Sequence, residues 1–173
     1  MTFSKTPLIG PICLKAVVGV TLSLSLNEGR AMSRLGDAEV RLQDGVPCFT
    51  LSAKDAKRDP NVRLSSISVS DASVRPVIDV WRLVFEPGKA VPLLGPGCFA
   101  YGQQSEGSRP ATAGELANGI VYDVALNVSP SDSSDPTKGY VAKFCLAGQG
   151  GDRRLVPVRP DTRAWREGRC NQQ

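Results

Sequence analysis

Four cysteines in the body of a chain that has no histidine are the feature that most narrows what this protein can fold into. The chain has 173 residues and five cysteines; Cys13 lies near its start, and the others are Cys48, Cys98, Cys145 and Cys170. An even cysteine count after a segment that can direct export predicts two disulfides in an oxidising compartment. The missing imidazole removes the usual proton shuttle of hydrolytic enzymes. We therefore expect a disulfide-braced, exported binding module.

The first 31 residues have the layout of a weak signal peptide. Two lysines precede a diluted apolar stretch at 16–26, and the Gly-Arg-Ala triplet at 29–31 offers small residues at the −3 and −1 positions of a cleavage site. The apolar stretch is shorter than the ~20 residues of a transmembrane helix. Cys13 precedes this stretch, so it is not the lipid-bearing cysteine of a lipoprotein, and membrane association would come only through the leader. The alternative is a cytosolic leader or a start codon placed too far upstream.

The remaining chain has the size and charge of one balanced domain. Residues 35–173 are predicted to form it, with 148–173 as a C-terminal extension tethered by a disulfide. The whole chain carries 21 basic and 17 acidic residues, and 18 basic against 16 acidic remain after the leader. That balance does not indicate a nucleic-acid partner.

The pattern after Arg34 predicts an all-β fold, because thirteen prolines and seventeen glycines interrupt the chain and no stretch keeps a helical period. Asp44-Gly45 is typical of a tight hairpin turn, and 120–128 alternates most clearly, as a central strand does. Polar loops are expected at 104–114 and 129–139. Seven strands predict an immunoglobulin- or fibronectin-like β-sandwich, at 38–43, 46–52, 64–70, 77–85, 91–103 with a kink at 95–97, 120–128 and 140–147.

Several short motifs carry a resemblance to a known family. They are Val-Pro-Cys-Phe at 46–49, a strand bearing Trp81, Pro-Gly-Cys-Phe-Ala-Tyr-Gly at 96–102 and Leu-Ala-Asn-Gly-Ile-Val-Tyr-Asp-Val at 116–124. Over residues 38–147 the chain resembles the immunity lipoproteins of type VI secretion systems, small periplasmic sandwich proteins that neutralise a toxin. The chain differs from them in having no lipobox and in its arginine-rich tail.

Tyr122 and the cysteines are interpreted as structural. A tyrosine at the start of such a strand places its hydroxyl on nearby backbone in many sandwiches. If strands 46–52 and 91–103 are neighbours, Cys48 and Cys98 bridge them and Cys145 pairs with Cys170, although four cysteines allow three pairings. The alternative is a reactive or metal-binding set of thiols, for which the chain lacks both the CxxC spacing and histidine.

The sequence contains no complete catalytic motif. No serine lies in a nucleophile elbow, and neither a P-loop nor a GxGxxG turn follows a strand. Asp132 and Asp135 form the best carboxylate pair for glycosidase-like chemistry, but they lie on a polar loop that is typical of a solvated connection. We expect no enzyme activity, no cofactor and no metal.

The tail has two interpretations. Its arginines alternate with apolar residues, which suits binding of phosphate or of an acidic protein surface. Alternatively, 154–158 is an edge strand whose outward arginines prevent edge-to-edge pairing. The arginines are Arg153, Arg154, Arg159, Arg163, Arg166 and Arg169.

The resemblance implies a periplasmic protein that covers a cognate toxin or effector and so inhibits it. Three connections of the expected sandwich would gather at one end, and their mixed charges would steer the encounter and select the partner. The alternative is a structural or adhesive envelope module, chaperone- or pilin-like. The expected partner-binding residues are Lys54, Asp55, Lys57, Arg58, Asp59, Glu86, Lys89, Asp132, Asp135 and Lys138.

Overall fold

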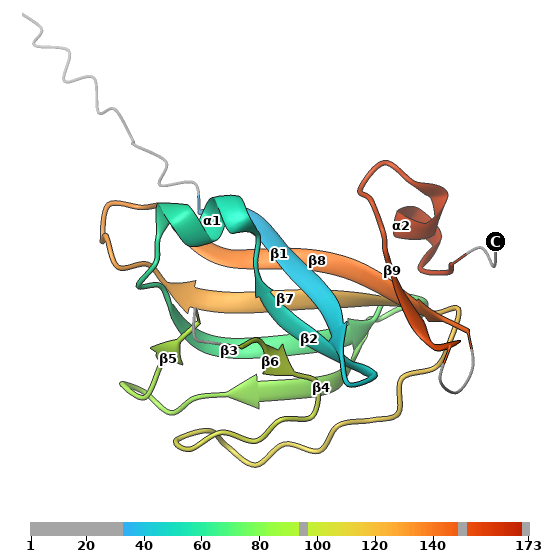
Figure 1. Ribbon diagram of the computed structural model, residues 1–173, viewed down its shortest axis with the longest axis horizontal. Helices are drawn as coiled ribbons and strands as arrows, with labels where there is room; N and C mark the ends of the chain where they lie inside the picture. Colours follow the sequence, from blue (N-terminus) through green and yellow to red (C-terminus); the bar gives the residue numbers. More distant parts are fainter. Residues whose placement is uncertain (1–32, 94–96, 149–151, 171–173) are drawn as a thin grey trace, which may run out of the picture. The chain divides into compact units, whose positions relative to one another are not determined.

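Strands dominate the computed structural model, which describes residues 33–93, 97–148 and 152–170 (Figure 1). The expected all-β class is confirmed, and the expected leader, with Cys13, lies outside the described residues. The described residues belong to one unit, Ala31–Gln173. Its elements are β1 (Arg34–Gln43), β2 (Val46–Leu51), α1 (Ala53–Arg58), β3 (Arg63–Asp71), β4 (Ile78–Val84), β5 (Val91–Pro92), β6 (Phe99–Ala100), β7 (Val121–Ser129), β8 (Thr137–Ala147), β9 (Arg154–Pro157) and α2 (Arg163–Glu167).

The strands form one mixed sheet in the order β4-β3-β7-β8-β1-β2-β6, with β5 added to β3 and β9 to β8. β7 is central and pairs antiparallel with β3 and β8. The alternation at 120–128 places Tyr122, Val124 and Leu126 in the main core, and Val121 is buried on the opposite face. The predicted central strand is therefore confirmed.

β1 joins the two layers of the curled sheet. Residues 34–37 run parallel to β8, and residues 38–43 run antiparallel to β2. Gly36 lies where β1 changes partner, and a Cβ there would be 2.5 Å from the Tyr140 ring, so this close approach needs glycine. β1 pairs with residues 137–141 of β8, and β9 pairs with residues 144–147 of the same strand. As a result β1, β2 and β6 lie across one face of the strands β3, β7 and β8 (Figure 1).

The main core lies between these layers and contains packed aromatic rings. Phe49 of β2 stacks on Trp81 of β4, with ring centroids 6.1 Å apart, and lies 6.2 Å from Phe144 of β8. Tyr101, just after β6, meets Trp81 edge-on at 5.3 Å. Burying a large apolar side chain contributes about 1.5–3 kcal/mol. Because these rings come from both layers, their burial holds the sheet in its curled form.

The strand expected at 91–103 is two short strands. β5 pairs with β3, whereas β6 pairs with β2, so this part of the chain passes from one layer to the other. β9 is a further strand, in the tail where an edge strand at 154–158 was one interpretation. The described residues therefore contain nine strands where the alternating pattern predicted seven, because strands of two to four residues show little or no alternation.

The polar segment expected as a surface loop at 104–114 follows the outer edge of β4. The backbone N–H groups of Arg109 and Gly114 donate to the carbonyls of Val84 and Val80, at 2.9 and 2.8 Å. The Tyr101 hydroxyl also donates to the Gly114 carbonyl, at 2.8 Å. A polar sequence is compatible with this place because covering a strand edge uses backbone groups that any residue provides.

Tyr122 serves the corner role expected from the sequence. Its hydroxyl accepts a hydrogen bond from the backbone N–H of Ala117 at 2.8 Å. Burial raises the pKa of this hydroxyl above its ordinary value, and its hydrogen bond to Ala117 only partly opposes that effect.

Two disulfides join the cysteines in the pairing favoured by the sequence. Cys48 of β2 is bonded to Cys98, next to β6, with Cα atoms 5.5 Å apart, and Cys145 of β8 is bonded to Cys170, with Cα atoms 6.4 Å apart. The first bond lies within one layer, and the second attaches the tail to the sheet. Two disulfides are consistent with an oxidising compartment.

The tail covers the face of β7 and β8 that points away from the main core. Ala72, Val121, Cys145 and Val158 form a second buried cluster there, with Trp165 and Ala164 of α2 packed against it. α2 was not predicted from the sequence. Thr162 caps its first turn by accepting from the Trp165 N–H, and Gly168 ends it with φ of 69°.

Candidate functional site

Charged residues gather at the end of the molecule where α1 and the β7–β8 connection lie. Figure 1 shows α1 beside this connection. The β4–β5 turn is at the same end, because Arg63 of β3 pairs with Pro92 of β5 and with Ser129 of β7. We call this region the charged end. The sequence predicted the gathering of these three connections.

The first of these connections contains a helix that the sequence analysis missed. Ser52 accepts a hydrogen bond from the Asp55 N–H at 3.2 Å and donates its hydroxyl proton to the Asp55 carboxylate at 2.9 Å. Lys57 and Arg58 occupy the last turn, where cations interact favourably with the helix dipole. Serine followed by an acidic residue three positions later is a helix-start signal and could have revealed α1.

Arg58, the last residue of α1, is the centre of a polar network between this helix, the β7–β8 connection and β8. Its guanidinium pairs with Asp55 at 2.6 Å and with Asp135 at 3.4 Å. It also donates to the hydroxyls of Tyr140 and Thr137, at 3.0 and 3.3 Å. Burial works to lower the pKa of Arg58, but Tyr140 and the two carboxylates outweigh it and raise this pKa above its ordinary value. The guanidinium is therefore a permanent charge shared among four internal partners.

Asp59 joins the end of α1 to the β7–β8 connection. Its carboxylate accepts from the Ser131 N–H at 2.8 Å and the Ser131 hydroxyl at 2.6 Å, and from the Asn61 N–H at 3.2 Å. Only 4% of Asp59 and 3% of Asp55 is exposed to solvent. These two residues were expected to bind a partner; instead they are buried, because each satisfies hydrogen-bond donors inside the protein.

The other expected partner-binding residues divide by exposure. Arg58 and Asp135 are partly covered by the network. The remaining six are exposed and lie on α1, on the β4–β5 turn, on the β7–β8 connection and, for Lys138, at the start of β8, so the charged end presents four cations and two anions to solvent. The six residues are Lys54, Lys57, Glu86, Lys89, Asp132 and Lys138.

Asp132 and Asp135 do not have the protonation states needed for glycosidase-like catalysis. Hydrogen bonds from Ser134 hold the pKa of Asp132 below its ordinary value, and hydrogen bonds from Thr137 do the same for Asp135. Both carboxylates are thus ionised near neutral pH. A general acid needs a raised pKa, so neither carboxylate is prepared to protonate a leaving group.

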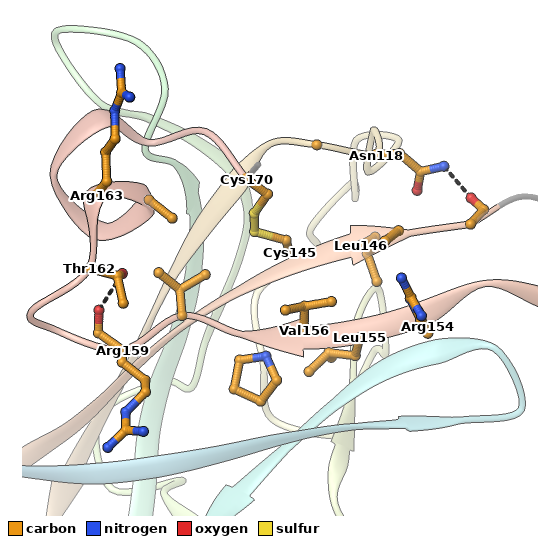
Figure 2. Close-up of a pocket in the computed structure, with 16 residues that line it drawn as sticks. Asn118, Cys145, Leu146, Arg154, Leu155, Val156, Arg159, Thr162, Arg163 and Cys170 are labelled. Atoms are coloured by element: carbon orange, nitrogen blue, oxygen red, sulfur yellow. Dashed lines mark hydrogen bonds between the residues drawn. A yellow bond between two sulfur atoms is a disulfide. The ribbon is translucent and has the colours of Figure 1, made fainter. Parts of the chain in front are cut away.

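A groove of about 850 Å³ lies at a different place, beside the second disulfide. Its floor is formed by β8 and β9, and α2 forms one wall (Figure 2). Three arginines are among the lining residues, together with Val156, which is 40% exposed. The sequence pointed to the tail as basic, but it did not reveal the groove. The arginines are Arg154, Arg159 and Arg163.

In the described part of the chain, no helix combines the length and the apolar character needed to pass through a membrane. Within the same residues, no three His, Cys, Asp or Glu side chains are grouped closely enough to hold a metal ion. No protein-family model, curated protein or solved structure matches this chain.

Proposed function

We propose that this chain is a non-enzymatic immunity protein that binds a cognate toxin and covers its active site with the charged end. The observation that carries the proposal is the Arg58 network. It fixes α1 against the β7–β8 connection through Asp135 and against β8 through Thr137 and Tyr140. The exposed charges above it are therefore held on a rigid base. A preorganised surface loses less conformational entropy on binding, and this favours a tight inhibitory complex.

The mixed charges of this surface suit a partner of complementary pattern. Lys54 and Lys57 lie on α1, Asp132 lies on the β7–β8 connection, and Lys138 lies at the start of β8. A patch that carries both signs binds one charge pattern and repels others, so it contributes specificity as well as association rate. Occlusion of a toxin buries about 800 Å² per partner.

We place the protein in the periplasm. The two disulfides support an oxidising compartment, and the second one attaches a tail whose own buried cluster is small. For a loop of about 25 residues, a disulfide contributes about 3.5 kcal/mol in the chain-entropy model. In a reducing cytosol the tail would lose this contribution.

We also propose that the fold is an immunoglobulin-like sandwich in its strand order. The layer β4-β3-β7-β8 corresponds to strands C′, C, F and G, and β1-β2-β6 corresponds to A, B and E. The hydrogen bond of Tyr122 at the start of β7 supports the same reading. The two layers share β1, which makes this sheet continuous.

A strand-exchanging envelope module fits the edges less well. The outer edge of β4 is occupied by the backbone of Arg109 and Gly114. β9 contains Pro157, which has no N–H to donate to an added strand. Polymerisation by strand addition needs an open edge.

The test is protection of cells against a toxin, which is first sought among the products of the genes that neighbour this one. The full chain is co-expressed with that toxin in the periplasm of a sensitive host, and surviving cells are counted. We expect Lys54→Glu/Lys138→Glu to reduce protection at least tenfold, because the charges of two surface cations, one on α1 and one at the start of β8, are reversed. The matched control, Arg159→Glu/Arg163→Glu, makes the same change in net charge elsewhere and should protect like the parent chain. Equal protection by the parent and the charged-end variant would remove the charged end from the proposal.

A further inference from the structure

The groove beside α2 is a second surface with the features of a binding site, and it is separate from the charged end. The lining residues come from β8, β9, α2 and the segment at 118–119, and none of them belongs to α1 or to the β7–β8 connection. An inference about this groove therefore rests on different residues from the function proposed above.

Positive charge is concentrated around this groove. Residues 152–170 contain six arginines and three acidic residues, a net charge of +3, whereas the whole chain carries +4. Among the residues that the structure describes, no aspartate or glutamate lines the groove. Arg163 lies 2.7 Å from Glu167, but 71% of its side chain is exposed, so this pair is weak and leaves the arginine accessible. The groove is thus suited to a negatively charged ligand.

The arginines are spread along the rim. Figure 2 shows the side chains of Arg159 and Arg163 directed away from one another, with Arg154 beside Leu155 at the other end of the floor. In this arrangement the guanidinium groups do not converge on one compact anion such as phosphate. They match carboxylates spaced along an extended chain, which arginine binds by paired hydrogen bonds.

The floor of the groove is partly apolar, so a matching ligand must also carry apolar groups. Val156 is 40% exposed, and Leu155, Val158 and Ala164 also line the groove. The described lining residues include no aromatic ring of the kind on which single-stranded nucleic acid stacks. A recessed, partly apolar floor fits side chains that insert into it. Together the floor and the rim select a peptide that carries both carboxylates and aliphatic side chains.

The groove is held open by bonds that do not depend on a ligand. The Cys145–Cys170 disulfide ties the end of the tail to β8. The Val121 N–H donates to the Gly168 carbonyl and the Cys170 N–H donates to the Gly119 carbonyl, both at 3.0 Å. Lys143 lies over the Trp165 ring, 4.5 Å from its centroid. Because α2 is fixed to the sheet in these ways, a ligand does not have to open the site.

We propose that this groove binds an extended acidic segment of a partner protein, one in which glutamate or aspartate alternates with aliphatic residues. The carboxylates meet the rim arginines, and the aliphatic side chains contact Val156 and its neighbours on the floor. The groove is thus a peptide-docking surface, in addition to the binding surface proposed at the charged end.

The test uses a capped nine-residue peptide of alternating glutamate and valine that carries a fluorophore. Its binding to the full, oxidised chain is measured by fluorescence anisotropy at about 0.15 M salt, near physiological ionic strength. The parent chain should bind it saturably, and a peptide with glutamine in place of glutamate should bind at least tenfold more weakly. Arg159→Glu/Arg163→Glu should also weaken binding at least tenfold, and the milder Arg159→Gln/Arg163→Gln by a smaller factor.

The control and the competing ligand decide the outcome. Lys54→Glu/Lys138→Glu has the same change in net charge and should bind within twofold of the parent. Equal weakening by both reversals, or equal binding of the glutamine peptide, would mean nonspecific charge attraction and would overturn the proposal. The proposal would also be overturned if the peptide does not bind while phosphatidylglycerol vesicles bind in a way that depends on Arg159 and Arg163. Loss of toxin protection leaves this test unaffected, because the two readouts use different residues.

Discussion

The charged end and the groove beside α2 are both rich in charge, but their charges are used differently. At the charged end, Arg58, Asp55 and Asp59 are occupied by internal bonds, and these bonds hold the connections in place. At the groove, a disulfide and backbone hydrogen bonds hold α2 and the tail against the sheet. Arg159 and Arg163 are consequently left at the surface. In each region, therefore, the charged side chains that a partner can reach are not the groups that hold the connections or α2 in place.

Removing the second disulfide should have the largest effect on this contrast. The Cys145→Ala/Cys170→Ala variant should lose about 3.5 kcal/mol of stability by the chain-entropy model for 25 residues. Amide hydrogen exchange should speed up in α2 and at Gly168, while β3 and β7 keep their protection. Uniform loss of protection throughout the sheet would show that the tail and the sheet unfold as one unit.

Removing Arg58 should have a slightly smaller effect, at the other region. Arg58→Met leaves the buried Asp55 carboxylate without its cation, and breaking such a pair costs about 3 kcal/mol. Urea unfolding measures the change. The matched variant at the groove is Arg163→Met, whose exposed pair with Glu167 contributes less than about 0.5 kcal/mol. Similar costs for the two substitutions would contradict the contrast between the regions.

Alkaline titration compares the two regions through their tyrosines, with a smaller expected effect. Tyr140 belongs to the Arg58 network of the charged end, whereas no tyrosine is among the described residues that line the groove. Burial raises the pKa of Tyr140, and it raises the pKa of Tyr101 from 10.0 to about 12. The folded state therefore keeps protons that the unfolded state has released, so stability is fully present below about pH 10 and falls as the pH rises towards 12.

Absorbance at 295 nm follows this ionisation directly. The folded chain should ionise its tyrosines at higher pH than the chain in urea, and Tyr101→Phe should remove the last step. Coincident titration curves in the two states would show that these hydroxyls are not shielded by the fold.

Much of the strand pattern follows from local chemistry. The turn predicted at Asp44-Gly45 has φ of 52° and 77°, as a tight hairpin requires. β2, β3, β7 and β8 lie within a few residues of the predicted ranges, because a two-residue period reflects burial of one face. The short helices were missed, since five or six residues are too few to show a helical period and only their caps carry a signal.

The two candidate sites could be predicted only in part. The sequence identified the residues of the charged end and the basic tail, since charge and position are visible in it. It did not show that Asp55 and Asp59 are buried, because this burial depends on contacts that form only after the chain has folded, such as the hydrogen bonds from Ser131 to Asp59. The groove was hidden for the same reason, since its floor and its wall come from separate parts of the chain.

The sequence by itself determined the all-β class, most strand positions, the hairpin turn and the four cysteines available for bonding. These depend on alternation, turn chemistry and composition, which act between near neighbours in the chain. Only the tertiary structure decided that β1 changes partner at Gly36, that 104–114 covers β4, and which charges face solvent. Those outcomes depend on contacts between residues far apart in sequence, and such contacts exist only once the sheet has curled.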